Sequence, residues 1–196
     1  KRQNFKGKIL IGDASDKTHA EKTERFIAST VSSLNIKYVK QHRYTVPQST
    51  IELSNMITTP YSVAVSDAAF LVPKAIEKCV TFLESNPDYV IAHGKAALFS
   101  LPTNEPYGLM NYVGPYSLPI HQEETATERL TSFLGNYSVP LYCVMRSQIW
   151  RNIWKNMNTI NNPSIAGEVL PAFLSVTYGK IKEIDSLYIL RHMHNK

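Results

Sequence analysis

The chain has 196 residues, of which 43% are apolar and 19% are charged, and its formal net charge is +5. These values exclude a disordered chain, and the length suits about one domain with a sizeable core. No run of about 18 or more apolar residues occurs, so the sequence predicts no transmembrane helix, and the modest positive charge fits a polyanionic ligand, an acidic membrane face or simply solubility.

The first third of the chain alternates between strand and helix signals. Short apolar runs alternate with stretches whose apolar residues recur at helical spacing, and a loop of small and acidic residues follows the first run. In that loop, Ser15 or Asp16 can cap the next helix. This order predicts an α/β fold with a mostly parallel central sheet, right-handed crossovers and flanking helices. The expected strands cover residues 8–11, 36–39 and a buried central strand from residue 61, and the expected helices cover residues 19–34 and 49–57.

Two aspartates follow predicted strands. Asp67 comes after the apolar run of the central strand, and Pro73 then suits the first position of a helix that continues to Leu83. Asp13 comes directly after the first strand. Open α/β sheets bind their ligands at the carboxyl ends of the strands, so both carboxylates are candidates for a binding site. The alternative is that each aspartate only terminates its strand and caps the turn.

The second part of the chain predicts a long loop between regular elements. The strand over residues 89–92 is interrupted by His93–Lys95, and residues 96–100 continue it as a hairpin or bulge. Residues 101–121 contain four prolines, several tyrosines and no periodicity, and those tyrosines stack on a sugar or pack the loop down. His93 is a candidate for a metal or substrate site, although a lone histidine more often has a structural role. Glu128-Arg129 fits a structural salt bridge. The remaining expected elements are helices over residues 123–134, 146–157 and 164–177, strands over 139–144 and 181–184, and a basic tail over 187–194.

The two cysteines, Cys79 and Cys143, both lie in apolar patterns. They are predicted to be buried free thiols in a reducing compartment. Two such cysteines cannot make a zinc site.

Several segments carry a resemblance to a known family. The stretch Ile9–Ser15 ends in Asp-x-Ser, and Val65–Pro73 contains Asp-Ala-Ala-Phe followed by an apolar pair and Pro. The first resembles the second strand of nucleotide-sugar glycosyltransferases of the GT-A fold, family-2-like. The second resembles their metal-binding strand end, usually Asp-Asp-Asp-Phe, an apolar pair and Pro. The resemblance covers nearly the whole chain. The other segments that match, in the order seen in a bacterial subgroup that builds surface polysaccharides, are Glu128-Arg129, Tyr142–Arg146, Gly167–Leu170, Tyr178–Lys180 and Arg191.

This resemblance implies a Rossmann-like GT-A domain that transfers a sugar from a nucleotide diphosphate sugar, most readily a UDP-sugar. The acceptor would be a saccharide or a lipid-linked molecule. Carried over residue by residue, Asp13 and Ser15 would bind the donor, with Asp13 at the uracil or ribose. Glu168 would be the general base that deprotonates the acceptor hydroxyl for an inverting attack. Arg191 would lie in a C-terminal segment that closes over the diphosphate.

The resemblance also implies a divalent cation, Mn²⁺ or Mg²⁺, held by Asp67 and His194. Here the sequence departs from the family, because Ala68 and Ala69 stand where carboxylates are usual and alanine supplies no ligand. Three alternatives stay open: an inactivated variant, a metal-independent enzyme in which Lys or Arg replaces the cation, or a natural degenerate relative.

A second departure concerns the start of the domain. The family's first strand and its Thr-x-x-Arg loop need more residues than Lys1–Gly7 provide. We therefore expect one glycosyltransferase domain over residues 1–196 that belongs to a longer chain or is a fragment. Residues 1–100 would bind the nucleotide sugar, and residues 101–196 would form the acceptor side.

The predicted function is glycosyl transfer in bacterial surface-polysaccharide synthesis, in the cytoplasm or at the inner face of the membrane. The first rival is a non-catalytic GT-A-like module that binds a saccharide or a partner domain. Loss of the second carboxylate favours this rival, whereas Glu168 favours the enzyme. The second rival, a sugar nucleotidyltransferase, should show a Gly-rich loop with a basic residue after the first strand, and none is visible. No nucleic-acid-binding motif is recognisable, so nucleic acid is not an expected partner.

Overall fold

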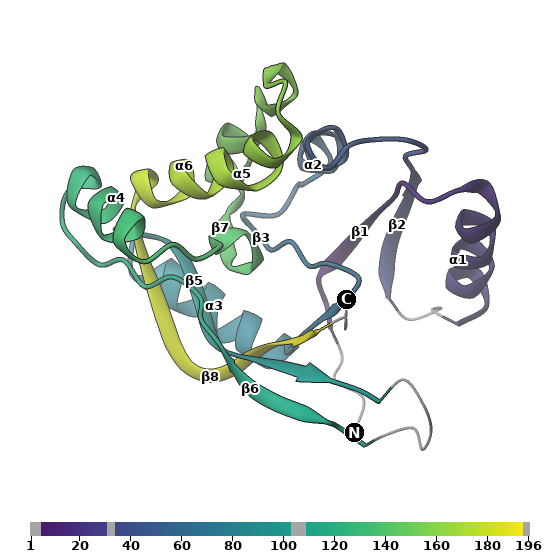
Figure 1. Ribbon diagram of the computed structural model, residues 1–196, viewed down its shortest axis with the longest axis horizontal. Helices are drawn as coiled ribbons and strands as arrows, with labels where there is room; N and C mark the ends of the chain where they lie inside the picture. Colours follow the sequence, from purple (N-terminus) through teal and green to yellow (C-terminus); the bar gives the residue numbers. More distant parts are fainter. Residues whose placement is uncertain (1–4, 31–33, 103–108, 194–196) are drawn as a thin grey trace. The chain divides into compact units, whose positions relative to one another are not determined.

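The computed structural model of the protein describes residues 5–30, 34–102 and 109–193 (Figure 1). The chain divides into two compact units that are not consecutive in sequence. The first unit comprises Lys1–Thr59 and Trp150–Pro171, and the second comprises Pro60–Ile149 and Ala172–Lys196. Both units combine strands with helices, which confirms the predicted α/β class. The assignment of donor and acceptor roles to residues 1–100 and 101–196 stays a prediction.

The first unit starts with a parallel strand pair. In the pairing of β1 (Lys8–Asp13) with β2 (Asn35–Lys40), Lys8 lies opposite Asn35 and Asp13 lies opposite Lys40. The connection is α1 (Lys17–Thr30), which is capped by Asp16 because its Oδ1 accepts a hydrogen bond of 3.0 Å from the backbone N–H of His19. The strand–helix–strand order of this region is therefore as predicted.

Helix α2 (Val46–Asn55) organises the rest of the first unit. It packs against β1, against the short 3₁₀ helix η2 (Met157–Thr159) and against the π-helix η3 (Ile165–Val169). The end of α2 is joined to α5 (Ser147–Trp154) where the indole N–H of Trp150 donates a hydrogen bond of 2.8 Å to the Ser54 hydroxyl. Both groups are buried, so this bond also satisfies two polar atoms that water cannot reach.

The second unit is built on a six-stranded sheet. Its strand order is β3-β7-β5-β8-β4, and β6 pairs with the distal half of β5. Two neighbours share one edge of β5, because β7 pairs with residues 91–92 and β6 with residues 96–100. Strand β8 runs parallel to β5 along its other edge. The strands are β3 (Tyr61–Ser62), β4 (Ala69–Leu71), β5 (Tyr89–Ser100), β6 (Tyr112–Tyr116), β7 (Val144–Arg146) and β8 (Lys180–His192).

The sheet is mixed rather than mostly parallel, which corrects one prediction. Of the pairings between described strands, only β1–β2 and β5–β8 are parallel. The others, β3–β7, β4–β8, β5–β6 and β5–β7, are antiparallel. The sheet is mixed because β5 pairs in antiparallel orientation with β6, the next described strand along the chain, and with β7.

The prediction of a buried central strand from residue 61 is wrong. The segment forms two short strands, β3 and β4, which lie at opposite ends of the strand order and pair with only one strand each. Residues 63–66 between them belong to no strand, and Val65 is 49% exposed. An apolar β-branched run fits a central strand only when strands pair with both of its edges, and the described residues supply a partner on one edge.

The C-terminal segment also differs from its prediction. Instead of a short strand and a basic tail, Lys180–His192 forms one continuous strand, β8. Its register against β5 shifts near Gly94 and Lys95, which fits the bulge, one of the two alternatives expected there, rather than a hairpin. The predicted loop over 101–121 contains β6, which is antiparallel to the end of β5. The patterns within each segment did not predict these strands, because β5 supplies the hydrogen-bond partners of both β6 and β8.

Four helical segments complete the second unit, and α3 (Pro73–Ser85) supplies part of its core. Cys79 and Leu83 of α3 are fully buried, as the predicted apolar stripe requires. Cys143 is equally buried, and both cysteines are free thiols. Burial raises the pKa of Cys79 to about 12 and that of Cys143 well above its ordinary value, so both stay protonated at neutral pH. The segments are α3 (Pro73–Ser85), α4 (Ala126–Gly135), the 3₁₀ turn η1 (Pro140–Tyr142) and α6 (Leu170–Tyr178). No helix in the described ranges is long and apolar enough to cross a bilayer.

Arg129 joins the end of α6 to the start of α4. Arg129 is only 5% exposed, and its guanidinium donates hydrogen bonds of 2.8–3.1 Å to four backbone carbonyls. Two of them, those of Val176 and Thr177, lie in the last turn of α6, where carbonyls have no partner within the helix. Glu128 instead closes a capping box with Thr125. The ion pairs of the described residues do not include Glu128–Arg129, so both residues are structural without forming the predicted salt bridge.

Replacing this guanidinium should destabilise the second unit. Arg129→Met leaves four backbone carbonyls without their charged donor, so we expect the free energy of unfolding to fall by about 2–5 kcal/mol. Urea denaturation followed by circular dichroism measures the change. The matched control is Arg25→Met, which replaces an exposed arginine of α1 and should change the value by less than about 0.5 kcal/mol. Equal effects of the two variants would contradict the structural role of Arg129.

Candidate functional site

The carboxylate of Asp13 is held at the end of β1 by three hydrogen-bond donors. Its Oδ1 accepts from the backbone N–H of Ser15 at 2.9 Å and from the Ser15 hydroxyl. Its Oδ2 accepts from the Tyr38 hydroxyl at 2.7 Å. Tyr38 lies on β2, and the parallel pairing of β1 with β2 brings it beside Asp13. Asp13 and Ser15, both predicted to bind the donor, therefore lie in direct contact.

These donors favour the ionised form of Asp13. Burial raises its pKa, but hydrogen bonds from Ser15, Tyr38 and Thr23 outweigh that effect and hold the pKa below the ordinary aspartate value. Burial and the hydrogen bond to Asp13 raise the pKa of Tyr38 to about 12, so Tyr38 remains a donor at neutral pH. A carboxylate offers about four lone-pair directions. Asp13 can therefore hold its turn in place and still accept a hydrogen bond from a ligand hydroxyl or N–H.

Glu168 lies in the same unit as Asp13. It is in the first turn of η3, where the backbone forms a π-helix before α6 begins, and its residue is exposed. This agrees with its predicted place in the first turns of a helix. Single-turn π segments within helices occur frequently at functional sites. Helix α2 contacts both β1, which carries Asp13, and η3, which carries Glu168, so one helix positions both elements.

Asp67 lies in the turn before β4 in the second unit. It does not follow a central strand, contrary to the prediction. The backbone N–H of His192 donates a hydrogen bond of 2.7 Å to the carbonyl of Ala68, and Ala69 is paired with Arg191. The end of β8 therefore fixes the backbone on which Asp67 is carried.

Arg191 neighbours this turn in the sheet, but its side chain is engaged elsewhere. Its Nη1 donates a hydrogen bond of 2.8 Å to the hydroxyl of Tyr116. Its guanidinium carbon lies 5.4 Å from the ring centre of Tyr116 and 5.3 Å from that of Tyr142, distances typical of cation–π contacts. The sequence did not identify these tyrosines as partners, because strand pairing and the η1 turn bring them to Arg191.

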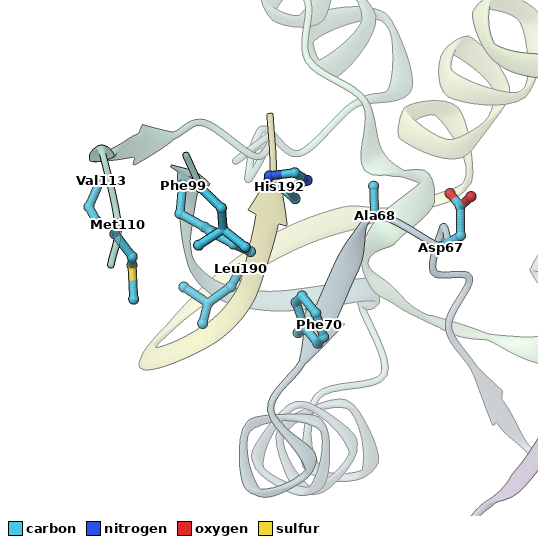
Figure 2. Close-up of a pocket in the computed structure, with 9 residues that line it drawn as sticks. Asp67, Ala68, Phe70, Phe99, Met110, Val113, Leu190 and His192 are labelled. Atoms are coloured by element: carbon cyan, nitrogen blue, oxygen red, sulfur yellow. The ribbon is translucent and has the colours of Figure 1, made fainter. Parts of the chain in front are cut away.

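An apolar pocket of about 460 Å³ lies beside Asp67. Strand register explains its lining, because Phe70 lies opposite Leu190 and Phe99 opposite His192 on the face of the sheet away from Arg191. Figure 2 shows Asp67 at one end of the lining residues and Met110 and Val113 at the other. Asp67 and His192 are the two polar side chains among these residues, so the pocket suits an apolar group rather than a diphosphate. The lining residues are Asp67, Ala68, Phe70, Phe99, Leu101, Met110, Val113, Leu190 and His192.

The residues around Asp67 do not form a protein-built metal site. Among the residues that the structure describes, no three His, Cys, Asp or Glu side chains form a group that could hold a metal ion. His194, the second predicted ligand, lies outside the described residues. Because Ala68 and Ala69 supply no ligand, a cation here would depend on the substrate's own oxygens. The divalent cation therefore stays a prediction.

His93, the other candidate from the sequence, has a structural environment. It is fully buried, with Nδ1 at 2.9 Å from the carbonyl oxygen of Gly94 and Nε2 at 2.8 Å from that of Pro119. Both ring nitrogens therefore face backbone carbonyls. This arrangement fixes the segment before α4 to β5 and favours the structural interpretation over a metal or substrate role.

The sequence matches no protein-family model and no curated protein sequence. Its fold is similar to that of solved structures of S. aureus TarS. The structure of TarS 1–349 in complex with UDP-GlcNAc is 12% identical, with a TM-score of 0.56 over 96% of this chain and 50% of that chain. The complex of TarS 1–349 with UDP is 10% identical, with a TM-score of 0.54 over 97% of this chain and 52% of that chain. A further TarS structure is 11% identical, with a TM-score of 0.57 over 97% of this chain and 32% of that chain. The chain thus spans about half the length of TarS 1–349.

The contact between Tyr38 and Asp13 can be tested by titration. Tyr38→Phe removes a donor that stabilises the ionised carboxyl, so we expect the pKa of Asp13 to rise. The stabilisation linked to that pKa is present above the unfolded-state value and is lost as pH falls through the folded-state value, so it should decrease in the variant. Carboxyl ¹³C resonances measured against pH report the pKa. The control is Tyr44→Phe, at a tyrosine that is 44% exposed, and superimposable Asp13 titrations in both variants would rule out the contact.

Proposed function

We propose that this chain is the catalytic part of a glycosyltransferase that uses a nucleotide diphosphate sugar, with a UDP-sugar as donor. The observation that carries the proposal is the ionised Asp13 carboxylate at the carboxyl end of β1, in a fold similar to that of a protein solved with UDP-GlcNAc and UDP. An oriented carboxylate in this place is suited to accept hydrogen bonds from a ribose or from the uracil N–H. Ser15 and Tyr38 maintain its orientation.

For the chemical step, we propose Glu168 as the general base of an inverting transfer. Its carboxylate takes the proton of an acceptor hydroxyl while that oxygen forms a bond to the anomeric carbon. The bond between the anomeric carbon and the diphosphate oxygen breaks, and its electron pair leaves with the UDP. Glu168 is exposed in the first turn of η3, so an acceptor can approach it. General-base catalysis of this kind contributes typically about 10²–10⁴-fold in rate.

Charge on the departing diphosphate needs a positive partner. The cation proposed from the resemblance would be held by Asp67, and by His194 beyond the described residues, and would supply Lewis-acid stabilisation of the leaving group. With one acidic ligand in the motif, Arg191 is the alternative source of positive charge. Its two tyrosine neighbours orient the guanidinium without neutralising it.

The acceptor is proposed to be a saccharide or a lipid-linked molecule of surface-polysaccharide synthesis. The pocket beside Asp67 supports the lipid-linked form, because seven of its nine lining side chains are apolar. Burial of an acyl or prenyl segment there would be favourable by roughly 25 cal/mol for each Å² of apolar surface removed from water. A longer parent protein would supply the remaining parts of such an enzyme.

The second candidate function is a GT-A-like module that binds a saccharide or a partner domain without catalysis. The observation that favours it is the presence of Ala68 and Ala69 in the metal motif. The two candidates differ in one measurable property, because a non-catalytic module retains no turnover with any nucleotide sugar. Donor binding and turnover must therefore be measured separately.

Calorimetric titration with UDP tests the donor site. We expect binding, strengthened by Mn²⁺ if Asp67 supports a cation and unchanged by Mn²⁺ if the site is cation-independent. Asp13→Ala should weaken binding by roughly 10–100-fold, since it removes hydrogen bonds to a charged acceptor. Asp185→Ala, at a carboxylate with 90% of its side-chain surface exposed, serves as the control and should leave the affinity unchanged. If UDP does not bind in either condition, the proposed donor is wrong.

Glu168→Gln tests the proposed base. The amide cannot accept the proton, so transfer from a UDP-sugar should slow by about 10²–10⁴-fold while UDP affinity stays the same. Single-turnover measurements separate the chemical step from binding. Glu84→Gln, an exposed glutamate of α3, is the matched control. Near-normal turnover of the Glu168→Gln variant would remove this residue from the catalytic role.

A further inference from the structure

The second unit contains another cavity, of about 480 Å³. Small-molecule sites typically range over roughly 300–1,000 Å³, so its size suits a ligand of one or two rings. Residues from β5, β6, β8 and α4 line it, together with the segment between β6 and α4. Among the described residues, none that lines this cavity also lines the apolar pocket beside Asp67. Asp13, Glu168 and Arg191 do not line it either.

Unlike the pocket beside Asp67, this cavity presents many polar groups. It offers one ammonium, one carboxylate, one imidazole, one amide and four hydroxyls, which together supply both donors and acceptors. They come from four separate parts of the chain: β5, the segment before α4, the end of α4 with the residues after it, and β8. The polar residues that carry the argument are Lys95, His121, Ser132, Asn136, Ser138 and Glu183.

His121 is a buried polar group with unused hydrogen-bonding capacity. It is 3% exposed, and its Nδ1 lies 3.3 Å from the Ser132 hydroxyl. Its Nε2 is buried and has no hydrogen-bond partner within the described part of the chain. Burial lowers the pKa of His121 despite the nearby carboxylate of Glu123, so the ring is neutral at neutral pH. A neutral imidazole with one unpaired nitrogen can pair with a hydroxyl as donor or acceptor.

The charges of the cavity favour a neutral ligand. Lys95 already forms an ion pair of 2.6 Å with Asp185, and Glu183 contributes the opposite charge to the lining. An anion would meet the Glu183 carboxylate, and a cation would meet the Lys95 ammonium. The lining also contains apolar and aromatic residues, including Pro115 and Tyr116, which suit the C–H faces of a pyranose ring.

We infer that this cavity is a binding site for a neutral saccharide of one or two sugar units. Hydroxyls of the ligand would pair with Glu183, Asn136 and Ser138, whose side chains are exposed or half-buried. The inference goes beyond the proposed function, because it rests on a separate set of side chains and holds whether or not the chain transfers sugars. In a transferase, such a site would hold part of a saccharide acceptor or product away from the reacting groups.

The test is an NMR titration of the isotope-labelled full chain with glucose, galactose, N-acetylglucosamine and maltose, each added separately at millimolar concentrations. Inorganic phosphate is the anionic comparison. At least one sugar should shift the amide resonances of Ser132, Asn136 and Ser138 and the ring ¹⁵N resonances of His121. The double variant Asn136→Ala, Ser138→Ala should weaken that binding at least tenfold. It changes one exposed and one half-buried side chain, so the fold should be retained. The control Asn158→Ala, an exposed asparagine of η2, should leave it unchanged.

Three results would overturn the inference: no shift at these residues with any sugar, shifts with phosphate alone, or sugar binding that the double variant leaves intact. None of them depends on UDP, so this experiment and the UDP titration fail independently. Sugar binding without UDP binding would retain the saccharide site and remove the proposed donor. The reverse outcome would retain the donor and remove this site.

Discussion

The parallel pairing of β5 with β8 is the constraint on which the second unit depends. These strands bury Ile91, Ile181 and Ile189 completely, and the other strands of the sheet are added to them: β6 and β7 on β5, and β4 on β8. A side chain at Gly94 would collide with the backbone carbonyl of Ser186, so glycine permits the close approach at the bulge. The same pairing carries β8 far enough to reach the turn of Asp67, so the position of the candidate metal ligand follows from a contact between distant segments.

Strand register divides the functional groups of the second unit between two faces. Alternation along β8 directs Leu190 and His192 to the apolar pocket and Arg191 to the tyrosines of the opposite face. A shift of one residue in register would exchange these sets, placing a guanidinium in an apolar pocket and leucine between the tyrosines. The cost of burying an unpaired charge thus specifies the register, and it also explains why Arg191 can be near Asp67 in the sheet without entering the same pocket.

In the first unit, one helix supports the two elements that carry candidate site residues. Helix α2 packs on β1 and on η3, so the ionised Asp13 and the exposed Glu168 are attached to a common element. Gly167 of η3 lies beside Val46 and Pro47, the first residues of α2, where a Cβ atom would make only ordinary van der Waals contacts. Buried Gln41 lies between β1 and α2, because its side-chain oxygen accepts a hydrogen bond from the Ser49 hydroxyl and a side chain at Gly12 would collide with it. The donors around Asp13 lower its pKa and orient its carboxylate, which suits a hydrogen-bond acceptor for a nucleoside.

The sequence by itself determined the α/β class, most helices and the short β1 and β2 strands, because apolar periodicity and capping residues act within a few neighbouring residues. It also located Asp13 and Ser15 at the end of a strand, and Glu168 in the first turn of a helix. Only the tertiary structure decided that Tyr61 begins an edge strand, that the tail continues as β8 and that the sheet is mixed. Those features depend on hydrogen-bond partners far away in the chain, which local patterns do not identify. For the same reason, the contacts of Tyr38 with Asp13 and of Tyr116 with Arg191, and the saccharide-sized cavity around His121, appear only when the strands are paired.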